Sequence, residues 1–356
     1  MSPDPVTELC AIVAGRRGEP SAGEPRAEIL ELAREHRVDR LLAWRTGRID
    51  HALRVEALLD EGRVQELNRV VAECEARGVE AIVLKGAALA HTHYEESWLR
   101  PRLDADILIP EPQRQIVFDL LRALGYTRPA FMSGTLVAHQ APFLRIDAVG
   151  NQHDIDVHWR VAEPHALADV LTYEDLASRS TRVTVRGQAM RVPSAPDALL
   201  LACMHRAAHH DLADDLLWIY DIHLLAGGLG TAEWQEFVQR AAGYAVKALC
   251  RNGLERSAWC FGTPIPPDVL LTLASPGPEP EPSAAYLRRD LRPLDRLALD
   301  VSMLGPGRGL RLIREHVLPP ASFIRERYAV RHSGLLPLFY ARRVLEGMSR
   351  WFTRAG

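Results

Sequence analysis

The sequence predicts an α/β (α+β) fold, in which a small mixed β-sheet core follows N-terminal helices and precedes a C-terminal helical region. Two observations predict it: apolar residues recur at helical spacing outside residues 76–192, and within that range short β-branched runs alternate with helical patterns. The 356 residues also suffice for two or three domains. We expect five segments, namely an N-terminal helical segment (1–75), the sheet core (76–192), a helical domain (193–262), a proline-rich linker (263–285) and basic C-terminal helices (286–356).

The N-terminal segment is predicted to be helical from its apolar periodicity. One helix is expected over 27–36 and another over 64–74. The second is predicted because its apolar residues share one helical face; they are Val64, Leu67, Val70, Val71 and Cys74. Gly78 ends this helix.

The core is expected to alternate between strands and helices, because short apolar runs are separated by glycine and by amphipathic stretches. In chain order, the predicted elements are a strand over 79–84, a helix over 87–94, a strand over 105–109, a helix over 112–124, and strands over 142–148 and 154–161 joined at Gly150–Asn151. A hairpin over 181–185 and 188–192 is expected to turn at Arg186–Gly187.

Beyond the core the pattern is again helical. Ser194 is expected to cap a helix, and further helices should follow to about residue 260. Prolines crowd residues 263–284, which predicts a linker or an irregular crossing segment. From Tyr286 onward, the predicted helices carry 14 arginines and 6 acidic residues, and such a pattern most often marks a solvated face.

Composition excludes several classes of protein. With 47% hydrophobic and 25% charged residues and a net charge of −3, the chain resembles an ordinary globular protein and does not favour a nucleic-acid partner. The five cysteines form no CxxC pair, so neither a disulfide framework nor a zinc ribbon is expected. No leader pattern and no run of about 18 apolar residues occurs, so we expect a soluble, cytoplasmic protein without a membrane span.

Two aspartates open the second predicted strand, in the segment LRPRLDADILIP. Side chains alternate along a strand, so Asp104 and Asp106 point to one face while Ala105 and Ile107 point into the core. Neighbouring carboxylates repel each other, and a divalent cation between them removes that repulsion. The pair therefore predicts a metal site.

A later strand, in the segment NQHDIDVHWRV, repeats this arrangement. Asp154, Asp156 and His158 share one face of the strand, and Ile155 and Val157 share the other. A third carboxylate on a neighbouring strand would complete a site for two divalent ions, Mg²⁺ or Mn²⁺, with a nucleoside triphosphate as substrate. We therefore expect Asp104, Asp106 and Asp156 to be the catalytic, metal-binding carboxylates.

Phosphate contacts are expected from the strand-to-helix turn in VLKGAAL. Gly86 would let backbone N–H groups approach a phosphate, and Lys85 would add a positive charge. Arg100 and Arg102, directly before the aspartates, are candidates for the same role, and His158 is a candidate nucleotide contact.

The whole pattern resembles the DNA polymerase beta-like nucleotidyltransferase superfamily. The motifs LKG, RPRLDADILI and IDVHWRV, the helix HRAAHHDLADDLLWIYDIHLL and the tail ASFIRERYAVRHSGLLPLFYARRV are more closely similar to a bacterial family of uncharacterised nucleotidyltransferases, from about Leu30 onward. The resemblance implies that Asp104 and Asp106 are the paired metal ligands and Asp156 the third carboxylate. It also implies that Gly86 is the glycine of the turn and Lys85 the lysine of the narrower family.

Two positions depart from the superfamily pattern. Ala87 replaces the serine that usually follows the glycine, and Leu103 replaces the serine or threonine that often precedes the first aspartate. Both changes bear on nucleotide affinity more than on metal binding. They motivate an alternative to the enzyme: a non-catalytic nucleotide-binding or antitoxin-like accessory protein with the same fold.

The resemblance implies transfer of a nucleoside monophosphate from an NTP to an acceptor, with release of pyrophosphate. The sequence leaves the acceptor open: a small molecule, a peptide, a protein or an RNA end, with nucleic acid not favoured. It also leaves open the base of the nucleotide and the oligomeric state.

Several neighbouring residues have simpler interpretations. For Asp154 a solvated position at the strand end is favoured, and for His158 a nucleotide contact and a plain hydrogen bond at the site edge are equally supported. His139 is expected to be structural and Trp159 to lie in the core. A third hypothesis, a histidine-based metallohydrolase, rests on His205, His209, His210 and Asp211, although no HExxH motif is present.

Overall fold

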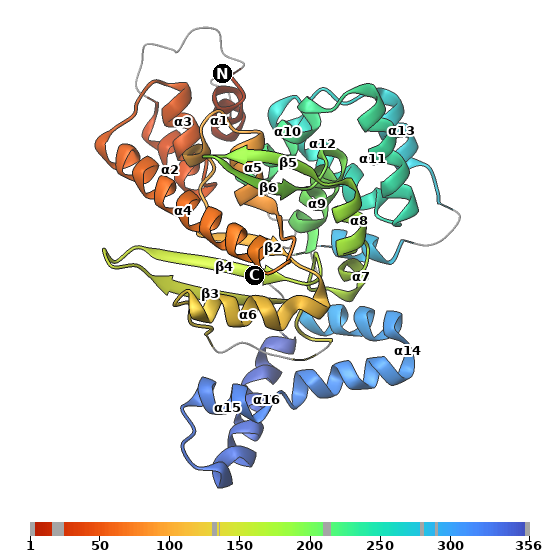
Figure 1. Ribbon diagram of the computed structural model, residues 1–356. Helices are drawn as coiled ribbons and strands as arrows, with labels where there is room; N and C mark the ends of the chain where they lie inside the picture. Colours follow the sequence, from red (N-terminus) through yellow and green to blue (C-terminus); the bar gives the residue numbers. More distant parts are fainter. Residues whose placement is uncertain are drawn as a thin grey trace.

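The computed structural model describes residues 4–15, 25–129, 134, 136–208, 215–277, 281–288 and 291–352. Within these residues, a six-stranded mixed sheet has the strand order β3-β4-β2-β1-β6-β5, and helices cover both of its faces (Figure 1). The predicted fold class, a mixed sheet with helical regions before and after it, is therefore confirmed.

The strands lie close to their predicted positions. They are β1 (Ile82–Val83), β2 (Asp104–Leu108), β3 (Gln140–Ile146), β4 (Gln152–His158), β5 (Thr181–Val185) and β6 (Gln188–Val192). β2 pairs with β4 in parallel and with β1 in antiparallel orientation, and β1 pairs with β6 in parallel. The two outer pairs, β3–β4 and β5–β6, are antiparallel.

The β5–β6 hairpin forms as predicted, with its turn at Arg186–Gly187. Both turn residues have positive φ, 51° and 85°, which is the conformation that a two-residue hairpin loop of type I′ requires. Glycine adopts it without cost, and this local chemistry sets the strand register.

One face of the sheet packs against α4 (His51–Ala76) and α6 (Arg114–Ala123). The side chains of Ile107, Val157 and Trp159 point to this face and join the buried core beneath the two helices. Ile82, Leu84 and Leu108 point to the opposite face. Alternation along the strands then places Asp106, Asp156 and His158 on that opposite face as well.

The opposite face is covered by a helical layer. α5 (Lys85–Thr92) follows β1 directly, α9 (Ala195–Ala208) packs next to it, and α10 (Leu216–Gly228), α11 (Thr231–Gly243) and α12 (Lys247–Phe261) continue the layer (Figure 1). The N-terminal helices α1 (Pro5–Val13), α2 (Ala27–Glu35) and α3 (Asp39–Arg45) share a core with α10 and α12, in which Leu9 and Ile29 accompany Tyr220 and Phe261.

The proline-rich segment differs from its prediction as a linker or irregular crossing. Pro267 occupies the first turn of a helix, α13 (Pro267–Ala274), whose Val269 and Leu273 lie in the core under α11 and α12. Proline is compatible with a first turn because its missing N–H would have no partner there. A 3₁₀ turn over Pro282–Leu287 follows.

The C-terminal region is helical, as predicted, and extends away from the N-terminal helices (Figure 1). α14 (Pro293–Val317) is kinked at Gly305, where φ is 72° and Pro306 follows. α15 (Ala321–Tyr328) and α16 (Leu336–Phe352) pack together around Phe323 and Ile324.

The remaining elements are short. They are α7 (His165–Ala168), α8 (Tyr173–Arg179) and three 3₁₀ turns over Ser97–Leu99, Glu111–Gln113 and Ser333–Leu335. All five cysteines are buried and free of disulfides, as expected. Among the helices that the structure describes, none combines the length and the apolar character needed to cross a membrane.

Candidate active site

The two acidic strands predicted from the sequence lie side by side in the sheet. β2 and β4 run parallel, and their register pairs Asp104 with Asp154 and Asp106 with Asp156. Because side chains at paired positions of adjacent strands point the same way, the four carboxylates gather on one face. The expected convergence of the Asp-x-Asp pair with Asp156 is therefore seen in the register.

The most compact group of possible metal ligands consists of Asp106, Asp156 and His158. One donor atom from each lies within 4.8 Å of the other two. Asp104 does not belong to this compact group and sits at the exposed end of β2. The structure thus brings together two of the three predicted carboxylates, with His158 as the third donor.

Lys85 and His158 both hold Asp106. The Lys85 Nζ atom donates to Asp106 Oδ1 at 2.6 Å, and His158 Nε2 lies 2.7 Å from the same oxygen. Burial and the charge of Lys85 lower the pKa of His158, against the opposing effect of its hydrogen bond to Asp106. A hydrogen bond was one of the two roles expected for His158, and the nucleotide contact stays a prediction.

The three aspartates respond differently to their surroundings. Burial acts to raise the pKa of Asp106, but Lys85 and His158 outweigh it and hold that pKa well below its ordinary value. Burial and the charges of Asp106 and Asp104 raise the pKa of Asp156 to about 7. Burial and Asp106 also raise the pKa of Asp104. The cluster therefore carries more negative charge than Lys85 compensates.

The turn between β1 and α5 is shaped by two residues, Lys85 and Gly86. Lys85, not Gly86, has the positive φ, 49°, which is uncommon for a residue with a side chain. Gly86 is buried at the start of α5, and a Cβ atom there would lie 3.2 Å from the guanidinium carbon of Arg100. The glycine thus makes room for an arginine.

Arg100, predicted to contact phosphate, is held by a buried carboxylate. Its Nε and Nη2 atoms donate to Asp221 of α10, with the Nη2 to Oδ2 distance at 2.8 Å, and Nη1 donates to the carbonyl oxygen of Pro101. The hydroxyl of Tyr94 donates to the same carboxylate at 2.7 Å. Arg100 therefore ties the helical layer to the segment that leads into β2.

Arg102, the other arginine predicted to contact phosphate, is also paired. Its Nη2 atom lies 2.8 Å from Asp60 Oδ1 of α4, and both side chains are buried. The hydroxyl of Ser97 donates to Asp60 at 2.6 Å. Each arginine before the acidic pair thus has its own aspartate, separate from the metal-binding candidates.

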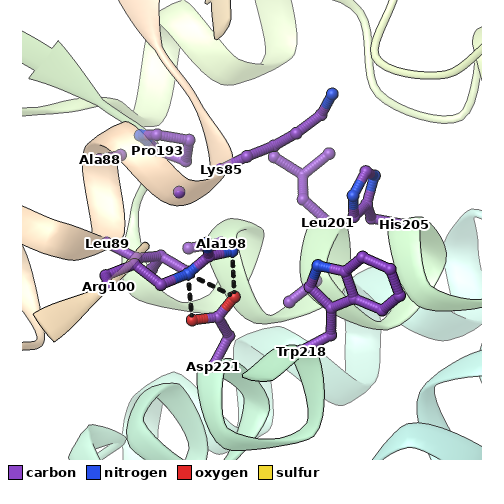
Figure 2. A pocket seen from close by; sticks show the side chains of 12 residues that line it. Lys85, Ala88, Leu89, Arg100, Pro193, Ala198, Leu201, His205, Trp218 and Asp221 are labelled. Atoms are coloured by element: carbon purple, nitrogen blue, oxygen red, sulfur yellow. Dashed lines mark hydrogen bonds and ion pairs between the residues drawn. The ribbon is translucent and has the colours of Figure 1, made fainter. Parts of the chain in front are cut away.

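A pocket opens beside Lys85, between α5, α9 and α10 (Figure 2). The Arg100–Asp221 pair lies on one side of it, and His205 and Trp218 lie on the other. Its walls are otherwise apolar and come from Leu89, Pro193, Ala198, Leu201 and Ala202. Since Lys85 lines this pocket and also binds Asp106, the pocket adjoins the acidic cluster.

The other residues singled out in the sequence have mixed outcomes. Asp154 is partly buried and accepts a hydrogen bond from Gln152 at 2.9 Å, so it is not a freely solvated strand end. Trp159 and His139 are buried, as expected, and His139 Nδ1 lies 2.9 Å from the carbonyl oxygen of Ala162.

The histidine cluster proposed for a metallohydrolase is placed only in part. His205 lies on α9 in the pocket lining, where its ring meets Trp218 edge to face at a centroid distance of 6.2 Å. His209, His210 and Asp211 lie outside the described residues.

Sequence reasoning missed Asp221 as a partner in this region. Its signal was a single acid within the otherwise apolar run LLWIYDIHLL, a position where a buried carboxylate needs a cationic partner. Lys85 and Asp106 were also predicted only as two separate candidate residues. Their ion pair joins two segments of the fold, and no local sequence pattern indicates such a contact.

The donor set fits a divalent metal ion. Carboxylate oxygens are the ligands that Mg²⁺ and Mn²⁺ prefer, and an imidazole suits Mn²⁺ as well. Burial and repulsion from Asp106 and Asp104 raise the pKa of Asp156, and a bound cation would relieve the repulsion.

Comparison with known proteins identifies the family. The family model described as uncharacterised nucleotidyltransferase matches residues 26–262, and no curated protein matches the chain. Two similar solved structures are the antibiotic-resistance factor ANT(2'')-Ia (16% identity, 55% of this chain, 98% of that chain, TM-score 0.37) and an antigenic nucleotidyltransferase-like protein from Paracoccidioides brasiliensis (14%, 58%, 95%, 0.37). Because the family match spans more than half of the sequence, this chain belongs to the uncharacterised nucleotidyltransferase family.

Proposed function

We propose that the protein transfers a nucleoside monophosphate from an NTP to an acceptor hydroxyl or similar group, using the acidic cluster of β2 and β4. The observation that carries this proposal is the parallel register that places Asp106 beside Asp156. Lys85 and His158 both contact the carboxylate of Asp106. In the reaction, the acceptor oxygen bonds to the α-phosphorus, the bond from that phosphorus to the β-bridging oxygen breaks, pyrophosphate leaves, and the hydroxyl proton passes to solvent.

Asp106 and Asp156 are the residues that would hold the metal, Mg²⁺ or Mn²⁺, with Asp104 at the exposed end of the same strand. Such an ion, when bound, supplies charge neutralisation for the triphosphate and polarises the reacting oxygens. His158 keeps Asp106 oriented through its hydrogen bond. Lys85 is the group that would exchange its contact with Asp106 for a phosphate oxygen of the substrate.

Arg100 and Arg102 enter this proposal as positioning residues. Their carboxylate partners fix the segment directly before Asp104 from two sides, α10 and α4. The apolar pocket beside Lys85 is the place where we expect part of a substrate to bind, because it is concave, mostly apolar and adjacent to the cluster.

The test is pyrophosphate release by purified protein with each NTP, Mg²⁺ or Mn²⁺, and a panel of small molecules, peptides, proteins and RNA ends. Mass spectrometry of each acceptor detects the added monophosphate. We expect release that requires metal and that Asp156→Asn abolishes, whereas Asp268→Asn, on the exposed start of α13, leaves it unchanged.

One observation favours the alternative, a non-catalytic nucleotide-binding or antitoxin-like protein. Leu103, which stands where the superfamily often has a hydroxyl, is 83% exposed beside Asp104 and offers no hydrogen bond to a phosphate. NTP binding without pyrophosphate release across the whole panel would support this alternative over the enzyme.

A further inference from the structure

A second charged region lies on the other face of β4. It is a groove of about 640 Å³ between α6, α14 and the end of β4, and we call it the basic groove. Among the described residues that line it, five are arginines and one is a carboxylate: Arg114, Arg122, Arg128, Arg311, Arg314 and Glu315. The lining therefore carries more positive than negative charge.

The single carboxylate is already engaged. Glu315 accepts hydrogen bonds from Arg311 Nε at 3.0 Å and from the backbone N–H groups of Leu136 and Val137 at 2.9 and 3.3 Å. It therefore compensates the charge of Arg311 and fixes the backbone at Leu136 and Val137.

Two of the other arginines, Arg122 and Arg128, lie near acidic side chains. Arg122 pairs with Asp119, an exposed carboxylate on its own helix. Over the part of the chain that the structure describes, neither Arg114 nor Arg314 forms an ion pair with a carboxylate. Burial and the charge of Arg122 lower the pKa of Arg128, with Glu326 opposing and Arg114 adding to the effect. The positive charges of Arg114 and Arg122 thus repel that of Arg128.

Two of these arginines are held in place by the floor of the groove. The guanidinium of Arg114 lies over the ring of Trp159 at 4.7 Å, and that of Arg128 lies over the ring of Phe118 at 5.5 Å. Cation–π contacts of this kind restrict the side chains before any ligand arrives.

The basic groove is separate from the acidic cluster. Trp159 directly follows His158, but the side chains of Val157 and Trp159 belong to the core under α6, whereas Asp156 and His158 face the helical layer. The sheet therefore lies between the two regions, and an NTP at the cluster does not occupy the groove.

We propose that the basic groove binds a small phosphate-bearing ligand other than the transferred nucleotide. Several guanidinium groups around one hollow match the geometry and charge of phosphate oxygens. Phe118 and Trp159 are buried, 5% and 4% exposed, so they offer no free ring faces on which the bases of a single-stranded nucleic acid would stack. This inference does not rest on the proposed catalysis.

The experiment is calorimetric titration of the full chain with inorganic tripolyphosphate in EDTA, without NTP. We expect binding that the double substitution Arg114→Gln/Arg314→Gln weakens by about tenfold or more, because it removes two charge-assisted contacts. The matched control, Arg77→Gln/Arg251→Gln, removes the same charge from exposed pairs on α4 and α12 and should change the affinity by less than about twofold.

Three outcomes would overturn the proposal. They are no measurable binding by the wild type, equal weakening by the control, or loss of binding in Lys85→Gln instead of in the groove variant, since the last would locate the phosphate at the acidic cluster. A 12-nucleotide RNA serves as the second probe. If the RNA binds through Arg114 and Arg314 while tripolyphosphate does not, the groove is a nucleic-acid site and the small-ligand proposal is wrong.

Discussion

The two faces of β4 carry charge of opposite sign. On one face, the three carboxylates of Asp104, Asp106 and Asp156 lie near Lys85, which forms an ion pair with Asp106. On the other face, five arginines surround a single carboxylate in the lining of the basic groove. In each region, the excess charge has the sign that attracts a ligand of the opposite sign: a metal ion on the first face and phosphate on the second.

The ion pairs near the acidic cluster are different, because they are balanced. Arg100 with Asp221 and Arg102 with Asp60 each pair one cation with one anion in a buried setting. Such pairs have no remaining charge to offer a ligand, and removing one partner leaves an uncompensated charge. Clusters with a net charge are therefore the candidate binding sites in this protein, whereas ion pairs without net charge stabilise the fold.

The largest expected effect concerns the unbalanced acidic cluster. Asp106→Asn removes a metal-ligand candidate and the partner of Lys85, so pyrophosphate release should fall on the order of 10³-fold or more. Initial rates with saturating NTP and acceptor measure this. A variant that keeps a tenth of the wild-type rate would break the assignment of this cluster as the active site.

A balanced pair should matter for stability. Asp221→Asn leaves the buried Arg100 guanidinium without a counter-charge, and we expect the free energy of unfolding in urea to fall by about 3 kcal/mol. Glu255→Gln, which breaks an exposed pair with Arg251 on α12, should cost less than about 1 kcal/mol. Equal losses in the two variants would contradict the framework role of Asp221.

Gly86→Ala tests whether the glycine makes room for Arg100. The new Cβ would lie 3.2 Å from a guanidinium that Asp221 holds in place, so we expect a loss of about 1–3 kcal/mol in unfolding free energy. Gly243→Ala, at the end of α11 with open space around it, should be neutral or stabilising. Because both substitutions add the same methyl group, a difference between their unfolding free energies reports the surroundings of the two glycines.

The metal-free acidic cluster should make stability depend on pH. The pKa of Asp156 rises from 3.8 to about 7 on folding, so its contribution is present at low pH and is lost as the pH rises from about 4 to about 7. Asp156→Asn removes that loss, and at pH 8 in EDTA the variant should exceed the wild type by about 1 kcal/mol or more. A variant less stable than the wild type at every pH would show that the cluster is balanced.

The smallest effect tests the backbone of the turn. Lys85→Ala and Lys85→Gly both lose the amine, but only glycine accepts the positive φ at this position without strain, so the glycine variant should be more stable by about 1 kcal/mol. At Arg69, inside α4, the order should reverse, with alanine the more stable variant by about 1 kcal/mol. Thermal melting curves of the four variants measure the order of stability at each position.

Local features were predictable from the sequence, and contacts between distant segments were not. The β5–β6 hairpin forms at its predicted residues because its Arg186–Gly187 turn is chemically specific. The alternation of the Asp-x-Asp strand predicted which side chains share a face. The helix α13 was missed because proline density was interpreted as a linker, although proline also begins helices.

The sequence predicted which carboxylates line the candidate site, but it did not predict the partners of the nearby cationic side chains. Arg100 and Arg102 lie next to the aspartates in sequence and were therefore expected to contact phosphate, but buried Asp221 and Asp60, from other parts of the chain, pair with them. Lys85 binds Asp106 in the structure, a partner that was not predicted, and its phosphate contact stays a prediction. The ion-pair partner of a charged side chain depends on which segments the fold brings together, and a single sequence does not predict these contacts.

We expect the excess negative charge on β2 and β4 to hold a divalent metal ion. Titration of Mn²⁺ into metal-free protein, followed by electron paramagnetic resonance, measures this directly. We expect stoichiometric binding by the wild type and a loss of affinity on the order of 100-fold in the Asp106→Asn/Asp156→Asn variant. Mn²⁺ binding that is unchanged in the double variant, or absent from the wild type, would contradict it.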